Sequence, residues 1–167
     1  MNLYFDYTLL PHPYPDEPLS KQEKWCSFAL KILDDNGNEI RTLIQSQWDL
    51  LPILNWFVDN KDSLLSESLP ISINDESSIA KGIYQFYDTL DDSMTLEKIV
   101  DDMFEYRERH EITFALRGKT VDDIIIGLKD DKYTVSLYNE EEKWSYEIRE
   151  LENFILGMER ILLDSSH

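Results

Sequence analysis

Histidine and cysteine most often carry nucleophilic, acid–base or metal chemistry, and the chain holds few of either. The three histidines, His12, His110 and His167, are far apart in sequence, and none has a second histidine or a cysteine at metal-ligand spacing. His110 lies in the run of basic and acidic residues at 107–111, a pattern typical of a helix C-terminus, where cations meet the negative end of the helix dipole. A general base is the alternative for His110. The single cysteine, Cys26, stands in an apolar run, which favours a buried, inert thiol over a nucleophile.

Acidic residues form two patterns that could bind a metal ion. The segment DDNGNE at 34–39 is comparable with the start of a calcium loop, but the EF-hand pattern needs glycine at its sixth position and glutamate at its twelfth. Here glycine is fourth and Ser46 is twelfth, so we expect a hairpin turn. Adjacent aspartates in a turn or helix diverge, so we expect solvated surface at four such pairs: Asp91-Asp92, Asp101-Asp102, Asp122-Asp123 and Asp130-Asp131.

The sequence also lacks the glycine motifs of a nucleophile elbow, a dinucleotide site or a phosphate loop. We therefore predict that the chain is not an enzyme and uses no cofactor and no metal. The remaining enzymatic alternative is a site assembled from scattered residues such as His110, Asp122 and Asp123.

The composition indicates a folded and strongly acidic chain. Its 167 residues include 34 acidic and 16 basic ones, which gives a formal net charge of −18. The 42% hydrophobic and 12% aromatic content can fill a core, and it argues against a disordered acidic tail. The length predicts one domain over residues 1–167. A field of this sign repels nucleic acid and anionic lipid and favours a basic protein partner.

Targeting signals are not found in the sequence. The N-terminus has no basic region, carries Asp6 and meets Pro11 before an apolar segment could form, so we expect no signal peptide. No run approaches the roughly 20 apolar residues of a membrane helix, so no membrane is expected. One cysteine permits no internal disulfide. These features predict a cytoplasmic protein.

Hydrophobic periodicity predicts the elements that position these residues. Strands are expected over 1–10, 24–33 and 39–44, and a proline-rich loop follows the first of them. Helices are expected near 47–60, 76–90, 95–109 and 149–163, and Pro52 either kinks the first or lies in its first turn. Four further runs predict an antiparallel meander of strands at 111–118, 122–129, 132–138 and 143–149. The predicted class is α+β, a single domain with an antiparallel meander sheet and packed helices.

Two acidic surfaces are the candidate partner-binding sites. In the helix at 95–109, apolar residues at helical spacing predict one buried stripe: Leu96, Ile99, Val100, Met103 and Phe104. The neighbouring face carries what we call the acidic ridge: Glu97, Asp101, Glu105 and Glu108. The second surface is a turn formed by Glu140, Glu141 and Glu142 beside Trp144. Trp144, like Tyr138 and Tyr146, is either an interface anchor or part of the core.

A resemblance adds a class of partner. The stretch QWDLLPILNWFVDNKDSLLSESLP at 47–70, together with the small, acidic α+β character of the chain, is similar to bacterial immunity proteins that neutralise polymorphic or contact-dependent toxins. The resemblance implies a toxin partner, often a nuclease, whose basic substrate-binding surface an acidic protein can cover. It transfers no site residues to this chain.

The leading hypothesis is a binding module that inactivates a basic partner by occlusion. A DNA mimic that inhibits nucleic-acid enzymes is the alternative. It requires carboxylates spaced like phosphates over a long surface, whereas here the acids are interleaved with 16 bases.

Overall fold

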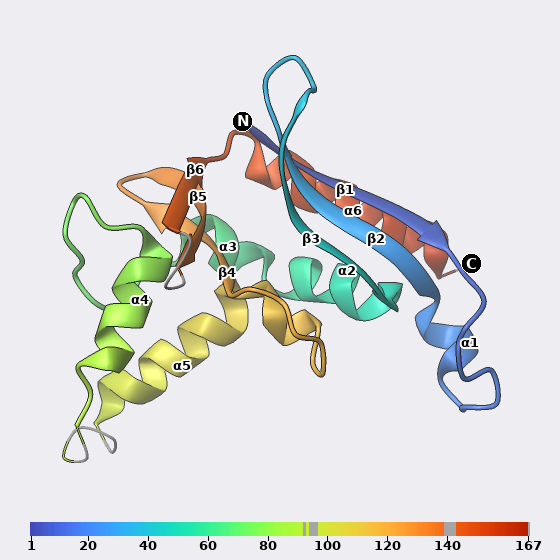
Figure 1. The fold of residues 1–167 in the computed structure, drawn as a ribbon, viewed down its shortest axis with the longest axis horizontal. Helices are drawn as coiled ribbons and strands as arrows, with labels where there is room; N and C mark the ends of the chain where they lie inside the picture. The colour runs from blue at the N-terminus through green and yellow to red at the C-terminus, as the bar shows by residue number, and fades with distance from the viewer. Residues whose placement is uncertain (92, 94–96, 139–142, 167) are drawn as a thin grey trace. The chain divides into compact units, whose positions relative to one another are not determined.

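The computed structural model describes residues 1–91, 93, 97–138 and 143–166. The chain divides into two compact units, each built around a three-stranded antiparallel sheet (Figure 1). The first unit comprises Met1–Lys61, Ala115–Lys119 and Arg149–His167, and the second comprises Asp62–Phe114 and Thr120–Ile148. The predicted α+β class, with antiparallel meanders and packed helices, is confirmed.

The sheet of the first unit follows the predicted strands. Strands β1 (Asn2–Leu9), β2 (Trp25–Leu33) and β3 (Glu39–Asp49) lie in the order β1-β2-β3. Alternate residues of β2 are buried because successive side chains of a strand point to opposite faces, and those buried include Cys26, Phe28, Leu30 and Ile32. The proline-rich loop after β1 ends in a short helix that the sequence did not predict, α1 (Ser20–Glu23).

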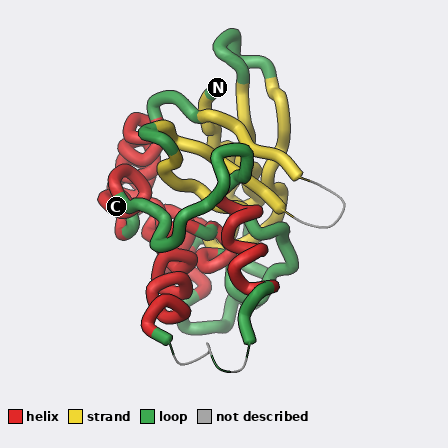
Figure 2. The backbone as a smooth tube through the Cα atoms, turned by 90° about the vertical axis from the view of Figure 1, so that its left-hand side faces the viewer, coloured by secondary structure: helices red, strands yellow, loops and turns green. Residues whose placement is uncertain are grey.

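The turn between β2 and β3 uses the acidic segment that is comparable with a calcium loop. Asp34 Oδ1 accepts hydrogen bonds from the backbone N–H groups of Asn36 and Asn38, both at 2.8 Å. Gly37 has φ +84°, a conformation that glycine adopts without steric cost. Hydrogen bonds from Asn38 and Asn36 lower the pKa of Asp34. The turn projects beyond its strands (Figure 2), and these contacts account for the segment as a hairpin.

Helices α2 (Leu50–Asp59) and α6 (Leu151–Ser165) pack on each other in the first unit. The predicted helix start at 47 is wrong because β3 continues to Asp49, and Trp48 is paired with Cys26 of β2. Pro52 is therefore the third residue of α2, in the first turn, where its missing N–H removes no intrahelical hydrogen bond. The rings of Phe57 and Phe154 meet edge to face, with centroids 5.2 Å apart.

The second unit combines a smaller sheet with three helices and a 3₁₀ turn. Strands pair in the order β4-β5-β6, and the β4–β5 hairpin turns at Asp130 and Asp131, whose φ angles are 51° and 59°. Positive φ at both central residues is typical of a two-residue hairpin. The elements are α3 (Lys61–Ser66), α4 (Ile79–Asp88), α5 (Lys98–His110), η1 (Ile112–Ala115), β4 (Ile124–Lys129), β5 (Lys132–Tyr138) and β6 (Lys143–Glu147).

The strand predicted at 111–118 is wrong. Residues Ile112–Ala115 form the 3₁₀ helix η1, and only Glu111 makes an isolated bridge, to Ile125. The buried apolar side chains of the segment are Ile112, Ala115 and Leu116. Their spacing of three and four residues is helical, whereas the sequence alternation suggested a period of two.

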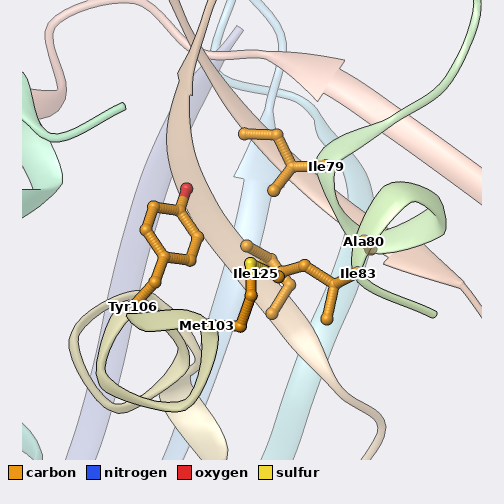
Figure 3. Close-up of a cluster of buried hydrophobic side chains, with 6 residues drawn as sticks. All are labelled: Ile79, Ala80, Ile83, Met103, Tyr106 and Ile125. Atoms are coloured by element: carbon orange, nitrogen blue, oxygen red, sulfur yellow. The ribbon is translucent and has the colours of Figure 1, made fainter. Parts of the chain in front are cut away.

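The core of the second unit lies between α4, α5 and β4. Figure 3 shows Tyr106 and Met103 rising from α5 toward Ile125 and the side chains of α4. The buried face of α5 consists of Met103, Tyr106 and His110. The predicted buried stripe is therefore wrong at Phe104, which is 48% exposed, and Leu96 lies outside the described residues.

Candidate functional site

The acidic ridge lies on the solvent side of α5. Glu97 is the N-cap residue of the helix, and Glu97, Asp101 and Glu105 are exposed, while Glu108 is half-buried. At 3.6 residues per turn these positions fall within an arc of about 80°, opposite the buried face. The structure thus gathers the four predicted acids on one face of one helix.

Phe104 joins this acidic face. Its position, three residues after Asp101 and four before Glu108, places it beside these acids, about 20° outside their arc. The ring is supported from one side by Phe114, with centroids 5.9 Å apart in an edge-to-face arrangement. Phe104, which the sequence predicted to be a core residue, is therefore an exposed aromatic ring beside the carboxylates of the acidic ridge.

The arginines of α5 are already engaged by carboxylates. Arg107 donates to Glu111, with Nε–Oε2 at 2.7 Å, and Arg109 donates to Glu67, with Nη2–Oε1 at 2.6 Å. Arg109 is also 3.9 Å from Glu105, the outer limit of an ion pair. Since both guanidinium groups are paired mainly with acids other than the ridge residues, the outer face of α5 keeps a negative balance.

The second predicted surface is described only in part. Glu140, Glu141 and Glu142 lie outside the described residues. Trp144 of β6 is half-buried, and its ring contacts Tyr146 at 5.2 Å between centroids. Trp144 and Tyr138 line a cavity of about 230 Å³ with Lys81 of α4. The partner-binding roles of this turn and of Trp144 remain predictions.

A separate cavity of about 210 Å³ opens in the second unit, beside the C-terminal end of α5. Ala80, Ile83 and Ile125 give it an apolar part. Its other lining residues are aromatic or charged: Tyr84, Tyr87, Tyr138, Arg107, Glu111 and Asp123. The rings of Tyr84 and Tyr138 lie 4.5 Å apart and form one aromatic wall.

Two carboxyl groups meet in this cavity. Glu111 is buried and accepts hydrogen bonds from Arg107 and from the hydroxyl of Thr113, the latter at 2.5 Å. The bridge between Glu111 and Ile125 brings the start of β4 beside Glu111, and with it Asp123. Partial burial, the negative charge of Glu111 and a hydrogen bond to it raise the pKa of Asp123, while Arg107 opposes this shift.

His110 belongs to a different, buried cluster. Its Nδ1 lies 2.7 Å from the carbonyl oxygen of Ile126, and its Nε2 lies 3.0 Å from Glu67 Oε2. The ring stacks on Tyr106, with centroids 3.9 Å apart and planes 10° from parallel. Burial lowers the pKa of His110, and its hydrogen bonds to Ile126 and Glu67 oppose that shift. His110 does end α5, as the sequence predicted, but it packs in the core.

The enzymatic alternative relied on three scattered residues. Of His110, Asp122 and Asp123, only Asp123 lines the 210 Å³ cavity among the residues that the structure describes. In the same part of the chain, no group of three or more histidine, cysteine, aspartate or glutamate residues is placed to hold a metal ion. Cys26 is buried, and burial raises its pKa to about 11, as expected for an inert thiol. Among the described helices, none has the length and apolar character needed to cross a bilayer.

The sequence did not predict the group formed by Arg107, Glu111 and Asp123. The spacing of Arg107 and Glu111 by four residues was a visible sign of an ion pair on a helix. Nothing in the sequence placed Asp123 against them, because that contact depends on the bridge between Glu111 and Ile125. Comparisons of the chain with protein-family models, curated proteins and solved structures gave no match.

Proposed function

We propose that the chain is an acidic binding protein that captures a basic protein through the outer face of α5. The observation that carries this proposal is the exposed ring of Phe104 among the carboxylates of the acidic ridge. Protein interfaces typically place a few aromatic anchors near their centre and polar groups at their rim. The arrangement suits a partner that offers a basic surface with an apolar recess.

Charge supports a protein partner over a nucleic acid or a membrane. The net charge of −18 creates a field that attracts basic surfaces and accelerates their association. The same field opposes contact with phosphate backbones and anionic headgroups. We expect electrostatics to set the association rate, and we expect the ring of Phe104, once it is buried in the complex, to slow dissociation.

The partner that fits this chemistry best is a toxin domain whose substrate is itself anionic, such as a nuclease. A nuclease needs a basic surface to bind phosphates, and an acidic protein that covers it excludes the substrate. We therefore propose an immunity function in the cytoplasm, in which the chain neutralises its toxin by occlusion. The general character of the chain, which resembles immunity proteins, favours the same conclusion.

The probe for this proposal is the protein encoded by the neighbouring reading frame. We expect the two purified proteins to form a complex at low ionic strength, and co-expression of this chain to suppress the toxicity of its neighbour. Failure of the purified proteins to associate would contradict the proposal. Equally tight binding to unrelated DNA-binding proteins would also contradict it and would favour the DNA-mimic alternative.

A further inference from the structure

More acidic than basic side chains line the 210 Å³ cavity of the second unit. Two carboxyl groups, Glu111 and Asp123, and one guanidinium, Arg107, line it among the described residues. Arg107 is committed to Glu111 by two hydrogen bonds, Nε–Oε2 at 2.7 Å and Nη2–Oε1 at 3.2 Å. Its Cζ also lies over the ring of Tyr87, 5.2 Å from the centroid. Asp123 is the second carboxyl group of the cavity and shares a hydrogen bond with Glu111, so the cavity has one surplus negative charge when Asp123 is ionised.

The other walls of the cavity are aromatic. Tyr84 and Tyr87 come from α4 and Tyr138 comes from the end of β5. The faces of such rings attract organic cations, and the attraction is strongest where water is excluded. A carboxylate beside aromatic rings is therefore suited to a guanidinium or a primary ammonium group, whereas it disfavours an anion.

The size of the cavity restricts its occupant. A volume of about 210 Å³ is smaller than the roughly 300–1,000 Å³ of pockets that enclose drug-sized ligands. It has room for a cationic group on a short alkyl chain, and a nucleotide would not fit. We propose that this cavity binds such a group, with Asp123 as its charge partner and the three tyrosine rings as its walls.

This cation has two possible sources, a free alkylamine or alkylguanidine and the lysine or arginine side chain of a protein. The proposal does not require the protein partner proposed above, because a small cation tests it directly. If the cavity binds no cation, the proposed interface on α5 is unaffected. If α5 contacts no basic partner, the proposed cation site is likewise unaffected.

The experiment is a titration of the whole chain with butylguanidinium and butylammonium, followed by amide and ring chemical shifts in NMR spectra. Butylurea, a neutral analogue of similar shape, and butyrate, an anion, are the ligand controls. We expect saturable shifts for Tyr84, Tyr87 and Tyr138 with the cations, at an affinity at least about tenfold above that of butylurea. Equal binding of butylurea would overturn the proposal.

The matched variants are Asp123→Asn and Asp122→Asn, which remove one charge each from adjacent positions, only one of which lines the cavity. We expect Asp123→Asn to reduce cation affinity about tenfold and Asp122→Asn to change it by less than about twofold. Equal effects of the two variants would overturn the assignment of Asp123. Titration with N-acetyl-arginine amide separates the two sources: binding assigns a protein side chain, and exclusion assigns a free small molecule.

Discussion

Arg107 and Glu111 form an ion pair, one helical turn apart, that is largely removed from water. Two hydrogen bonds join them, and the side chain of Glu111 is 4% exposed. Helix α5 contains a second pair of the same spacing, between Lys98 and Asp102 at 2.7 Å, in which the side chain of Lys98 is 85% exposed. The two pairs have the same spacing and differ in burial, so a comparison of them measures the effect of burial on the stability that an ion pair contributes.

We expect Arg107→Met to destabilise the fold by about 3–5 kcal/mol, because it leaves the buried carboxylate of Glu111 without its cation. The matched change Lys98→Met should cost about 0–1 kcal/mol, since an exposed pair contributes little. Urea unfolding followed by circular dichroism measures both values. Equal losses of stability would show that burial of the Arg107 pair has no energetic consequence.

Gly127 on β4 lies close to the side chains of Tyr106 and Ile79. A Cβ atom at this position would lie 2.6 Å from the hydroxyl of Tyr106 and 3.1 Å from Cδ1 of Ile79. The ring of Tyr106 is fully buried and stacked on His110, so it has little freedom to move away. We expect Gly127→Ala to cost about 1–3 kcal/mol in the free energy of unfolding.

The double variant Tyr106→Phe with Gly127→Ala tests the cause of that cost. The Tyr106 hydroxyl has no hydrogen-bond partner among the described residues, so its removal alone should be close to neutral. It also removes the nearest clashing atom. We expect the double variant to recover part of the lost stability in thermal unfolding. A simple sum of the two single effects would contradict this explanation.

Ionisation of Asp123 should make the free energy of unfolding depend on pH. The pKa of Asp123 in the folded chain is raised above the ordinary value of 3.8, by burial and by Glu111. Asp122 adds to this shift, and Arg107 opposes it. The folded state therefore binds the proton more tightly, and the contribution of Asp123 to stability falls as pH rises from 3.8 through the raised pKa.

We expect Asp123→Asn to be more stable than the unmodified chain near neutral pH, with the difference disappearing below the unfolded pKa. Denaturant unfolding at a series of pH values measures it, and Asp122→Asn is the control for loss of one charge. A stability difference for Asp123→Asn that does not vary with pH would contradict the proposed environment of Asp123.

The sequence predicted those elements whose local signals agree with their packing. The alternation in β2 and the DNGN turn defined the first hairpin, and the Asp130-Asp131 pair marked the second. It failed where a local pattern had two interpretations. Residues 111–118 are rich in β-branched and apolar side chains, yet Ile112–Ala115 form a 3₁₀ helix, in which the buried Ile112 and Ala115 are three residues apart.

The candidate site was partly predictable for a similar reason. The four acids of the acidic ridge follow from helical spacing alone. Phe104 was assigned to the core because periodicity cannot determine where an apolar stripe ends, whereas its ring is exposed and contacts Phe114. The neighbours of Asp123 depend on a contact between α5 and β4 that no local pattern encodes.

Phe104 should matter for binding and little for folding. We expect Phe104→Ser to weaken the complex with the neighbouring-frame protein by about 2 kcal/mol, because the substitution removes an aromatic anchor. The free energy of unfolding of the variant should change by less than about 1 kcal/mol. Leu163→Ser is the control, since Leu163 is 60% exposed and lies on α6 of the first unit. Calorimetric titration compares the two variants. Unchanged affinity for Phe104→Ser would place the anchor elsewhere.

If the acidic ridge of α5 contacts the basic partner, reversal of its charges should slow association. The variant carries Asp101→Lys, Glu105→Lys and Glu108→Lys. Two variants with the same change in charge serve for comparison: Glu152→Lys, Glu159→Lys and Asp164→Lys on α6, and Glu140→Lys, Glu141→Lys and Glu142→Lys at the second predicted surface.

The measurement is the stopped-flow association rate with the neighbouring-frame protein across a salt series. For the unmodified chain we expect the association rate to fall as salt rises, because exposed charges are screened beyond about 10 Å at 0.1 M ionic strength, while the dissociation rate changes less. At low salt the α5 variant should associate at least about tenfold more slowly, and the α6 variant should retain most of its rate. An equal loss in all three variants would mean that overall charge alone matters, and no loss in the α5 variant would place the interface elsewhere.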